Sequence, residues 1–294
     1  QLRGLRQIYF KPPASLARGG FLFGILRRSM KKVHKIGLFD SGLGGLTVLK
    51  ALEEVLPQVP KIYYGDTLHL PYGDKSDEAI IGYSLRIVEF LRQKGCDVIV
   101  IACNSASAAA GAVLEQSFPS LIFVNVIDPV VASLADGNEK KVGLLGTRAT
   151  VRSEEYPRRL SVLNNNVELV SLPTPLLVPL IEDGFLRSGI AEQVLRHYLN
   201  SPSLNGITSI VPGCTHYPLL KELAQKVLKD VRWIDAPEIV AAQVKQWWDS
   251  ESRLNQPNKN GETEFFVSDK TESFMELAQS TFGISASWET AVLP

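Results

Sequence analysis

The stretch DVIVIACNSAS, residues 97–107, indicates the fold class of the chain. It opens with an apolar, β-branched run, which is typical of a strand buried on both faces of a parallel sheet. The run ends at Cys103 and is followed by polar residues. A second stretch of the same design, TSIVPGCTHYP at 208–218, places Cys214 directly after its strand. Because ligands bind at the carboxyl ends of parallel strands, both cysteines are candidate functional residues.

The alternation of strand and helix continues along the chain from Lys35 onward. Helical segments with apolar residues at three- and four-residue spacing separate the apolar runs, and they include residues 45–56, 77–95 and 217–230. The expected strands are residues 35–39, 61–65, 97–102, 121–127, 141–145, 167–172, 207–212, 231–235 and 264–268. This pattern predicts an α/β fold with mainly parallel sheets.

A weak internal repeat indicates that one α/β unit is present twice. The segment KIGLFDSG at 35–42 resembles KVGLLGTR at 141–148, which sets Ser41 against Thr147. The two cysteine stretches form a second matching pair, which sets Cys103 against Cys214 in the same way. We therefore expect two similar domains related by pseudo-twofold symmetry, with the active site in the cleft between them.

The repeat also suggests where the domains begin and end. Residues 31–128 together with 240–294 are expected to form the domain that carries Cys103. Residues 129–239 are expected to form the domain that carries Cys214.

Two segments are expected to lie outside these folded domains. Residues 1–30 contain no acidic side chain, and their apolar run at 21–26 is too short for a signal peptide or a membrane span. We expect them to be a poorly ordered leader or extension. The polar stretch at 249–263 is expected to be a surface loop.

Charge and cysteine content exclude several classes of protein. Among the 294 residues, 31 Lys and Arg balance 31 Asp and Glu, so no global field attracts nucleic acid or an anionic membrane. We expect neither as a partner. The three cysteines are too few for a disulfide framework, and their odd number favours reduced thiols in the cytoplasm.

The three cysteines differ in their neighbours. Asn104-Ser105 follows Cys103 and Thr215-His216 follows Cys214, where a packing cysteine would have apolar company. Cys96, in QKGCDVIV, is instead expected to be a small buried hydrophobe. A zinc site is disfavoured because the chain has no C-x-x-C pair and His216 is only two residues from Cys214.

The segment DSGLGG, residues 40–45, resembles a phosphate-binding loop only weakly. Thr47 stands where the third glycine of G-x-G-x-x-G would be, and Asp40 at the strand end would repel a phosphate. We therefore expect no bound nucleotide there.

Six short motifs occur in order along the chain: FDSGLGGL (39–46), PYGDKS (71–76), ACNSAS (102–107), GTRATV (146–151), VPLIEDG (178–184) and GCTHYPLL (213–220). Together they resemble the cofactor-independent glutamate racemases. The resemblance runs from about Lys32 to Gly283. One departure is Ser105, where the family more often has threonine. Serine keeps the hydroxyl, so altered packing is expected and not lost activity.

The resemblance implies racemisation of glutamate by two cysteines. Inversion of an α-carbon removes a proton from one face and returns one to the other, which two opposed acid/bases can do. The resemblance assigns Cys103 to D-glutamate and Cys214 to L-glutamate. Since a free thiol is only a few per cent ionised at neutral pH, neighbouring acids and bases are expected to assist. The expected catalytic helpers are Asp40, His216 and Glu182.

The remaining motif residues fit substrate binding without a metal or an organic cofactor. Neutral donors suit the substrate carboxylates, and Asp40 with Ser41 can face the ammonium group. For Ser41 and Thr147 a simple helix N-cap is the alternative. The predicted binding residues are Asp40, Ser41, Tyr72, Gly73, Asn104, Ser105, Thr147, Thr150, Thr215 and His216.

Other functions stay open on the sequence alone. Aspartate racemase, or another paired-cysteine racemase or isomerase of the superfamily, is the main alternative. A hydrolase with a Cys214–His216 nucleophile and base would need a sharp turn between these residues. A binding role is a third alternative, because some relatives bind DNA gyrase. The resemblance also implies cytoplasmic supply of D-glutamate for peptidoglycan, and it leaves room for a homodimer and a cell-wall-precursor regulator.

Overall fold

The computed structural model describes residues 35–164, 166–251 and 261–294, which all belong to one compact unit, Val33–Pro294. The predicted leader at 1–30 and most of the predicted loop at 249–263 lie outside the described residues. The predicted division of the chain into two domains stays a prediction.

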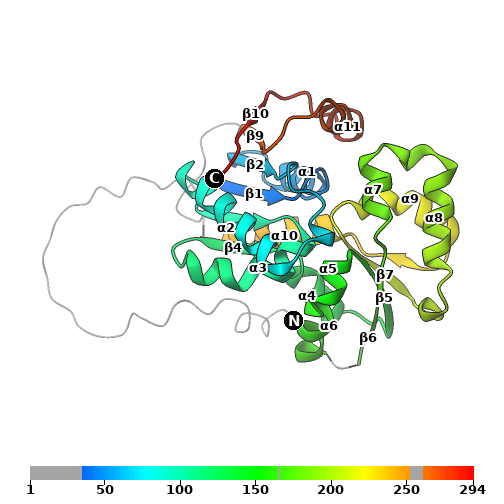
Figure 1. Cartoon of the computed structure of the whole chain (residues 1–294). Helices are drawn as coiled ribbons and strands as arrows, with labels where there is room; N and C mark the ends of the chain where they lie inside the picture. Colours follow the sequence, from blue (N-terminus) through cyan, green and yellow to red (C-terminus); the bar gives the residue numbers. More distant parts are fainter. Residues whose placement is uncertain (1–34, 165, 252–260) are drawn as a thin grey trace, which may run out of the picture. The chain divides into compact units, whose positions relative to one another are not determined.

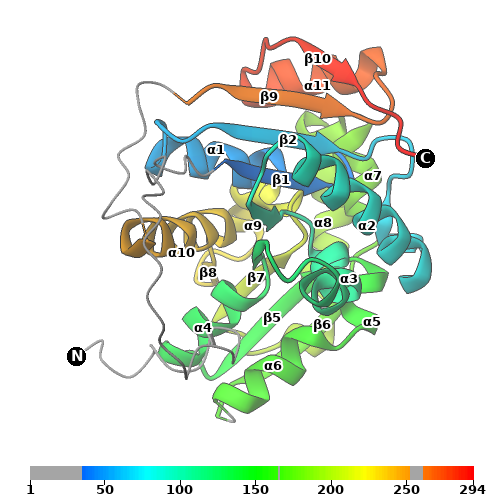
Figure 2. The same cartoon turned by 90° about the vertical axis from the view of Figure 1, so that its left-hand side faces the viewer.

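The described strands form two parallel sheets, as Figures 1 and 2 show. The larger sheet runs in the order β10 (Trp288–Thr290), β9 (Thr263–Val267), β2 (Lys61–Gly65), β1 (Ile36–Asp40), β3 (Val98–Ile101) and β4 (Ile122–Asn125). The smaller sheet runs in the order β6 (Glu168–Pro173), β5 (Lys141–Gly146), β7 (Ser209–Gly213) and β8 (Arg232–Trp233). All described strand pairs are parallel, which confirms the predicted α/β fold.

The two sheets share one strand order, which agrees with the internal repeat. Strands β2-β1-β3-β4 correspond in order to β6-β5-β7-β8. In each sheet the second strand lies on one side of the first strand, and the third strand lies on its other side. Such a switch point is where α/β proteins bind ligands, at the carboxyl ends of the strands. The pseudo-twofold axis itself stays a prediction.

Helices connect the strands and cover the sheets. The α-helices are α1 (Leu46–Val55), α2 (Asp77–Gln93), α3 (Asn104–Ser117), α4 (Asp128–Asp136), α5 (Arg148–Arg152), α6 (Glu155–Leu163), α7 (Leu177–Glu182), α8 (Gly189–Leu199), α9 (Lys221–Val227), α10 (Ala236–Glu251) and α11 (Glu272–Phe282). Short 3₁₀ turns are η2 (Tyr72–Asp74), η3 (Phe185–Arg187), η4 (Pro202–Leu204) and η5 (Tyr217–Leu220).

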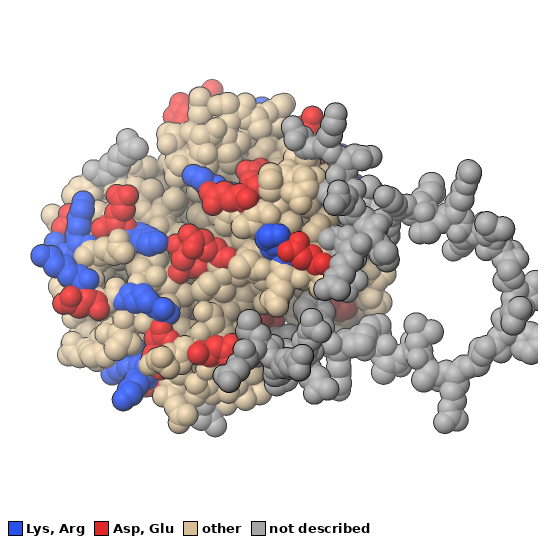
Figure 3. Space-filling model, turned by 180° about the vertical axis from the view of Figure 1, so that it is seen from behind, with Lys and Arg blue, Asp and Glu red and all other residues tan. Residues whose placement is uncertain are grey.

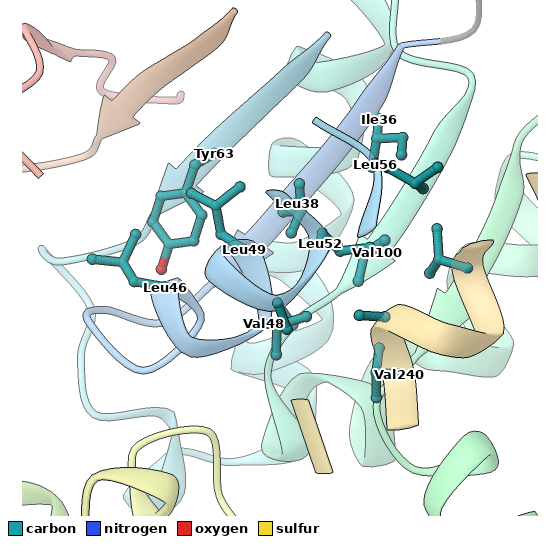
Figure 4. Close-up of a cluster of buried hydrophobic side chains, with 14 of the residues drawn as sticks. Ile36, Leu38, Leu46, Val48, Leu49, Leu52, Leu56, Tyr63, Val100 and Val240 are labelled. Atoms are coloured by element: carbon teal, nitrogen blue, oxygen red, sulfur yellow. The ribbon is translucent and has the colours of Figure 1, made fainter. Parts of the chain in front are cut away.

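The larger sheet is buried on both faces, because alternate side chains of a strand point to opposite sides. Leu38 of β1 joins a cluster with Leu49 and Leu52 of α1, which Figure 4 shows. Phe39, the next residue, belongs to a second cluster with side chains of α2 and α3 such as Leu91. Continuous apolar runs in the sequence follow from this burial on both faces.

Helix α10 returns the chain from the smaller sheet to the larger one. It follows β8 and packs on both α1 and α4. Its Val240 and Val244 are fully buried in the cluster that contains Leu52. The two sheets are therefore held by shared apolar packing as well as by their connecting segments.

Two elements differ from the sequence-based expectation. The expected helix at 217–230 is instead the 3₁₀ turn η5 followed by α9. Pro218 lies in the first turn of η5, where a backbone N–H would make no hydrogen bond within the helix, so proline is tolerated there. Strand β10 was not expected, because its three residues are too few for a readable pattern.

The surface agrees with the balanced composition on the face that Figure 3 draws. Acidic and basic side chains are interspersed there, with no extended patch of one sign. Within the described ranges, no helix combines the length and apolar character that a membrane crossing requires.

The packing of α1 gives a direct test of this core. Replacing Leu52, which is fully buried, with alanine removes apolar contacts and leaves a cavity. We expect Leu52→Ala to lower the free energy of unfolding by about 2–5 kcal/mol in a urea titration. Lys50→Ala, at an exposed position of the same helix, is the matched control and should change it by less than about 0.5 kcal/mol. Equal effects of the two changes would contradict the placement of α1.

Candidate active site

A small cavity lies at the carboxyl ends of strands from both sheets. Its lining comes from the segments that follow β1, β3, β5 and β7, together with η2 and α7. The lining residues are Ser41, Pro71, Tyr72, Gly73, Cys103, Asn104, Ser105, Thr147, Val178, Cys214, Thr215 and His216. The two cysteines singled out in the sequence thus line one cavity.

The loop after β1 wraps around the carboxylate of Asp40. Asp40 Oδ2 accepts hydrogen bonds from the backbone N–H groups of Gly42 at 3.1 Å and Gly45 at 2.9 Å. These amides are the groups that a phosphate loop would offer to its ligand, so the loop already holds an anion of its own. Asp40 is fully buried and lies behind the lining of the cavity.

Gly44 lets the two sheets meet at this loop. A Cβ atom at Gly44 would lie 2.4 Å from Nδ1 of His216 and 2.7 Å from Oγ1 of Thr215, which no side chain could tolerate. Thr215 donates a hydrogen bond to Asp40 Oδ1 at 3.3 Å, and Thr47 donates to the Thr215 carbonyl at 3.0 Å. The DSGLGG loop and the GCTHYP turn therefore form one packed unit.

Cys103 lies in a buried environment with an acidic neighbour. Its Sγ is 4.0 Å from Oγ of Ser41, a weak contact. Burial raises the pKa of the Cys103 thiol well above its ordinary range, and the Asp40 charge raises it further. Burial also raises the pKa of Asp40, although the charge of His216 and the hydrogen bonds from Gly45 and Gly42 oppose the shift. These surroundings favour the protonated form of the Cys103 thiol.

Cys214 has a basic neighbour. The chain turns sharply after β7, where the Tyr217 N–H donates to the Cys214 carbonyl at 3.0 Å. This turn brings His216 Nδ1 to 3.6 Å from Cys214 Sγ. On the far side of the ring, His216 Nε2 is 2.5 Å from Oε1 of Glu182, which also accepts from the Leu43 N–H at 3.3 Å. The sharp turn needed for direct contact between thiol and imidazole is present.

The hydrogen-bond partners of His216 favour the protonated form of its imidazole. Burial alone would lower the pKa of His216, but its hydrogen bonds to Cys214 and Glu182 outweigh burial and raise it well above the ordinary value. Burial acts to raise the pKa of Glu182, and the hydrogen bond with His216 overcomes this and lowers it. The two groups thus form a charged pair beside Cys214.

The hydroxyl groups of Ser105, Thr147 and Thr150 form a cluster at the cavity. Ser105 Oγ is 2.9 Å from Thr147 Oγ1, and the Thr147 hydroxyl donates to Thr150 Oγ1 at 3.0 Å. Thr147 also caps α5, because its side chain accepts from the Thr150 N–H at 3.1 Å. The N-cap alternative therefore holds for Thr147 without removing it from the cavity. The N-cap position of α1 is Gly45, so Ser41 is not a cap.

The PYG turn closes on this cluster. A Cβ atom at Gly73 would lie 2.7 Å from Cβ of Thr147, so only glycine permits the approach. The hydroxyl of the neighbouring Tyr72 donates to Oδ2 of Asp66 at 2.5 Å, and His69 Nδ1 lies 2.9 Å from Oδ1 of the same carboxylate. Asp66 thereby fixes the position of the Tyr72 ring.

The structure places the predicted residues in two layers. Ser41, Tyr72, Gly73, Asn104, Ser105, Thr147, Thr215, His216 and both cysteines line the cavity, whereas Asp40, Thr150 and Glu182 lie behind it and bond to lining residues. Sequence reasoning missed Pro71, Val178 and Asp66, and it missed Tyr156, whose hydroxyl donates to Oδ1 of Asn104 at 2.7 Å. Pro71 and Val178 lie inside quoted motifs, which could have signalled them, but no local pattern marks Asp66 or Tyr156.

Cys96 behaves differently from the other two cysteines. It is buried in the apolar cluster on the α2 side of the larger sheet. Burial raises the pKa of its thiol to about 12, so it has no tendency to ionise at neutral pH.

Comparison with known proteins shows which family the chain resembles. Residues 43–244 match the model of the Asp/Glu/Hydantoin racemase family. The glutamate racemase of Aquifex aeolicus is 38% identical over 250 residues, which cover 85% of this chain and 94% of that protein.

Two solved structures are similar as well. The Francisella tularensis glutamate racemase in complex with D-glutamate has a TM-score of 0.83 and 32% identity, covering 88% of this chain and 98% of that one. The Escherichia coli glutamate racemase, in complex with L-glutamate and the activator UDP-MurNAc-ala, has a TM-score of 0.70 and 27% identity, covering 85% and 94%. The family model matches more than half of the chain, and the Aquifex relative is similar over most of both proteins. The chain therefore belongs to the Asp/Glu/Hydantoin racemase family.

Proposed function

We propose that this racemase interconverts L- and D-glutamate by moving protons between the substrate and two thiols. The observation that carries the proposal is that Cys103 and Cys214 follow corresponding strands, β3 and β7, and line one small cavity. An enzyme that inverts an α-carbon needs one acid/base on each face of that carbon. Glutamate is favoured over aspartate because the similar proteins described above, at 27–38% identity, are glutamate racemases.

The environments of the two thiols fit the direction from L- to D-glutamate. In our proposal Cys214, as thiolate beside the His216 cation, takes the α-proton of L-glutamate. Cys103, kept as a thiol by burial, gives its proton to the opposite face of the deprotonated α-carbon. After turnover Cys103 is the thiolate and Cys214 the thiol, so the reverse reaction uses the exchanged roles. Asp40 and His216, with Glu182 behind the imidazole, are proposed to assist the nearer thiol.

Neutral donors around the cavity are proposed to bind the charged substrate. Hydrogen bonds from the hydroxyl and amide groups of Ser105, Thr147, Asn104 and Thr215 suit the two carboxylates. Ser41 lies on the Cys103 side with Asp40 behind it, and we assign the substrate ammonium to this side. No organic cofactor or metal takes part in the proposed reaction.

The cellular role follows from the proposed product. D-glutamate made by this enzyme would enter peptidoglycan synthesis in the cytoplasm and so support cell wall biogenesis and cell shape. Because the similar Escherichia coli enzyme is described with the activator UDP-MurNAc-ala, we propose a cell-wall precursor as a regulator of this chain too. A homodimer is a further proposal, carried over from the resemblance alone.

The activity itself is tested in deuterated water. The purified protein, with no added pyridoxal phosphate or metal, should convert either enantiomer of glutamate into an equal mixture, because the products are mirror images. The α-position of the product should carry deuterium from the solvent. Circular dichroism and proton NMR follow both events in one sample. Inhibition by EDTA, or a requirement for pyridoxal phosphate, would contradict the two-thiol mechanism.

Single cysteine replacements separate the active site from the scaffold. Cys103→Ala and Cys214→Ala should each abolish racemisation, since either change leaves one face of the α-carbon without an acid/base. Thermal unfolding of both variants should stay cooperative. Cys96→Ser is the control and should keep nearly full turnover, because Cys96 lies among apolar side chains away from the cavity. A Cys103→Ala enzyme that still racemises would rule out the proposed role of that thiol.

A glutamate analogue with a leaving group on the β-carbon tests the division of labour. Such a compound eliminates after the α-proton is removed and needs no proton from the opposite face. Cys103→Ser should eliminate only from the L-compound and Cys214→Ser only from the D-compound, with a contrast of about 10²–10⁴-fold. Asp40→Asn and His216→Asn should cause milder losses, biased toward the enantiomer handled by the nearer thiol. Equal loss of both enantiomers in both serine variants would refute the assignment of one base per face.

A further inference from the structure

The side chain of Asn104 is held by a tyrosine from the other half of the molecule. Asn104 begins α3 directly after Cys103 and lines the cavity. Tyr156 lies in α6, which follows β5 of the smaller sheet, and its hydroxyl donates to Oδ1 of Asn104 at 2.7 Å. Both side chains are buried, with exposed fractions of 4% for Asn104 and 1% for Tyr156.

The chemistry of this contact fixes which end of the amide faces the cavity. Burial raises the pKa of the Tyr156 phenol, so the hydroxyl keeps its proton and needs an acceptor. Among the residues that the structure describes, Asn104 Oδ1 is its one hydrogen-bond acceptor. The amide nitrogen, at the other end of the group, has no hydrogen-bond partner within the described ranges. It is therefore left to donate to a ligand in the cavity.

We infer that Tyr156 is a positioning residue, which keeps the N–H donors of Asn104 directed at a substrate carboxylate. This inference rests on the proposed function. Without the hydroxyl, the amide gains freedom to rotate by half a turn, and its carbonyl oxygen would then face the carboxylate and repel it. The two rotamers differ in charge pattern and hardly in shape, so packing alone does not choose between them.

Tyr156→Phe removes the hydroxyl and keeps the ring. We expect the KM for L- and D-glutamate to rise about tenfold, as befits one hydrogen bond to a charged group, while kcat changes by less than about threefold. Tyr64→Phe is the matched control, because Tyr64 is another buried tyrosine whose hydroxyl donates a hydrogen bond at 2.7 Å, to the Ala291 carbonyl, and Tyr64 does not line the cavity. Its KM should equal that of the wild type.

A double-mutant cycle separates positioning from packing. If Tyr156 acts through Asn104, then Tyr156→Phe should add nothing to the KM of an Asn104→Ala enzyme. A further tenfold rise in that background would overturn the inference, and so would an unchanged KM in the single Tyr156→Phe variant with an intact thermal transition. A wild-type protein that does not racemise glutamate would instead contradict the proposed function. The two failures are therefore distinguishable.

Discussion

The close approach of Gly44 to the side chains of Thr215 and His216 brings the two sheets into contact where their strands end. It needs a residue without a side chain on one side and a sharp turn on the other. Around it, Asp40 orders the glycine loop, and Thr215 bonds to Asp40 across the interface. The same few residues thus join the halves of the fold and set the two thiols on one cavity. A scaffold made from two separate sheets gains a site that neither sheet contains alone.

The two sides of this cavity differ in charge although their strands correspond. Cys103 is near a buried carboxylate, whereas Cys214 contacts a histidine that is ion-paired with Glu182. The two sulfur atoms therefore lie in different electrostatic environments, one beside a carboxylate and the other beside an imidazole.

Local pattern made most strands and the helices α1 and α2 predictable, whereas the resemblance to a family pointed to most residues that line the cavity. The runs at 97–102 and 207–212 are apolar because both faces of their strands are covered. This burial affects consecutive residues, so it shows in the sequence as a continuous apolar run. The motifs carried the cysteines, the hydroxyl groups and the glycines. Tyr156 could not be predicted, because it acts on Asn104 of another segment through a hydrogen bond that depends on how the helices pack. Asp66 bonds to Tyr72 and His69 within one loop, where no periodic pattern marks it. Strand β10 is hidden for a different reason, since it is too short for alternation to show.

The order of strands in the larger sheet has a consequence for synthesis of the protein. Strand β2 pairs on one side with β1, which directly precedes it in the strand sequence, but on the other side with β9, which is made after the whole smaller sheet. While the ribosome is still producing residues 66–262, the outer edge of β2 has no native strand to cover it. An uncovered edge offers free N–H and C=O groups to any other chain. The nascent polypeptide thus carries an aggregation-prone edge until nearly the last of its sequence has emerged, and chaperone protection during this interval would matter more than for a chain whose edge strands are made first.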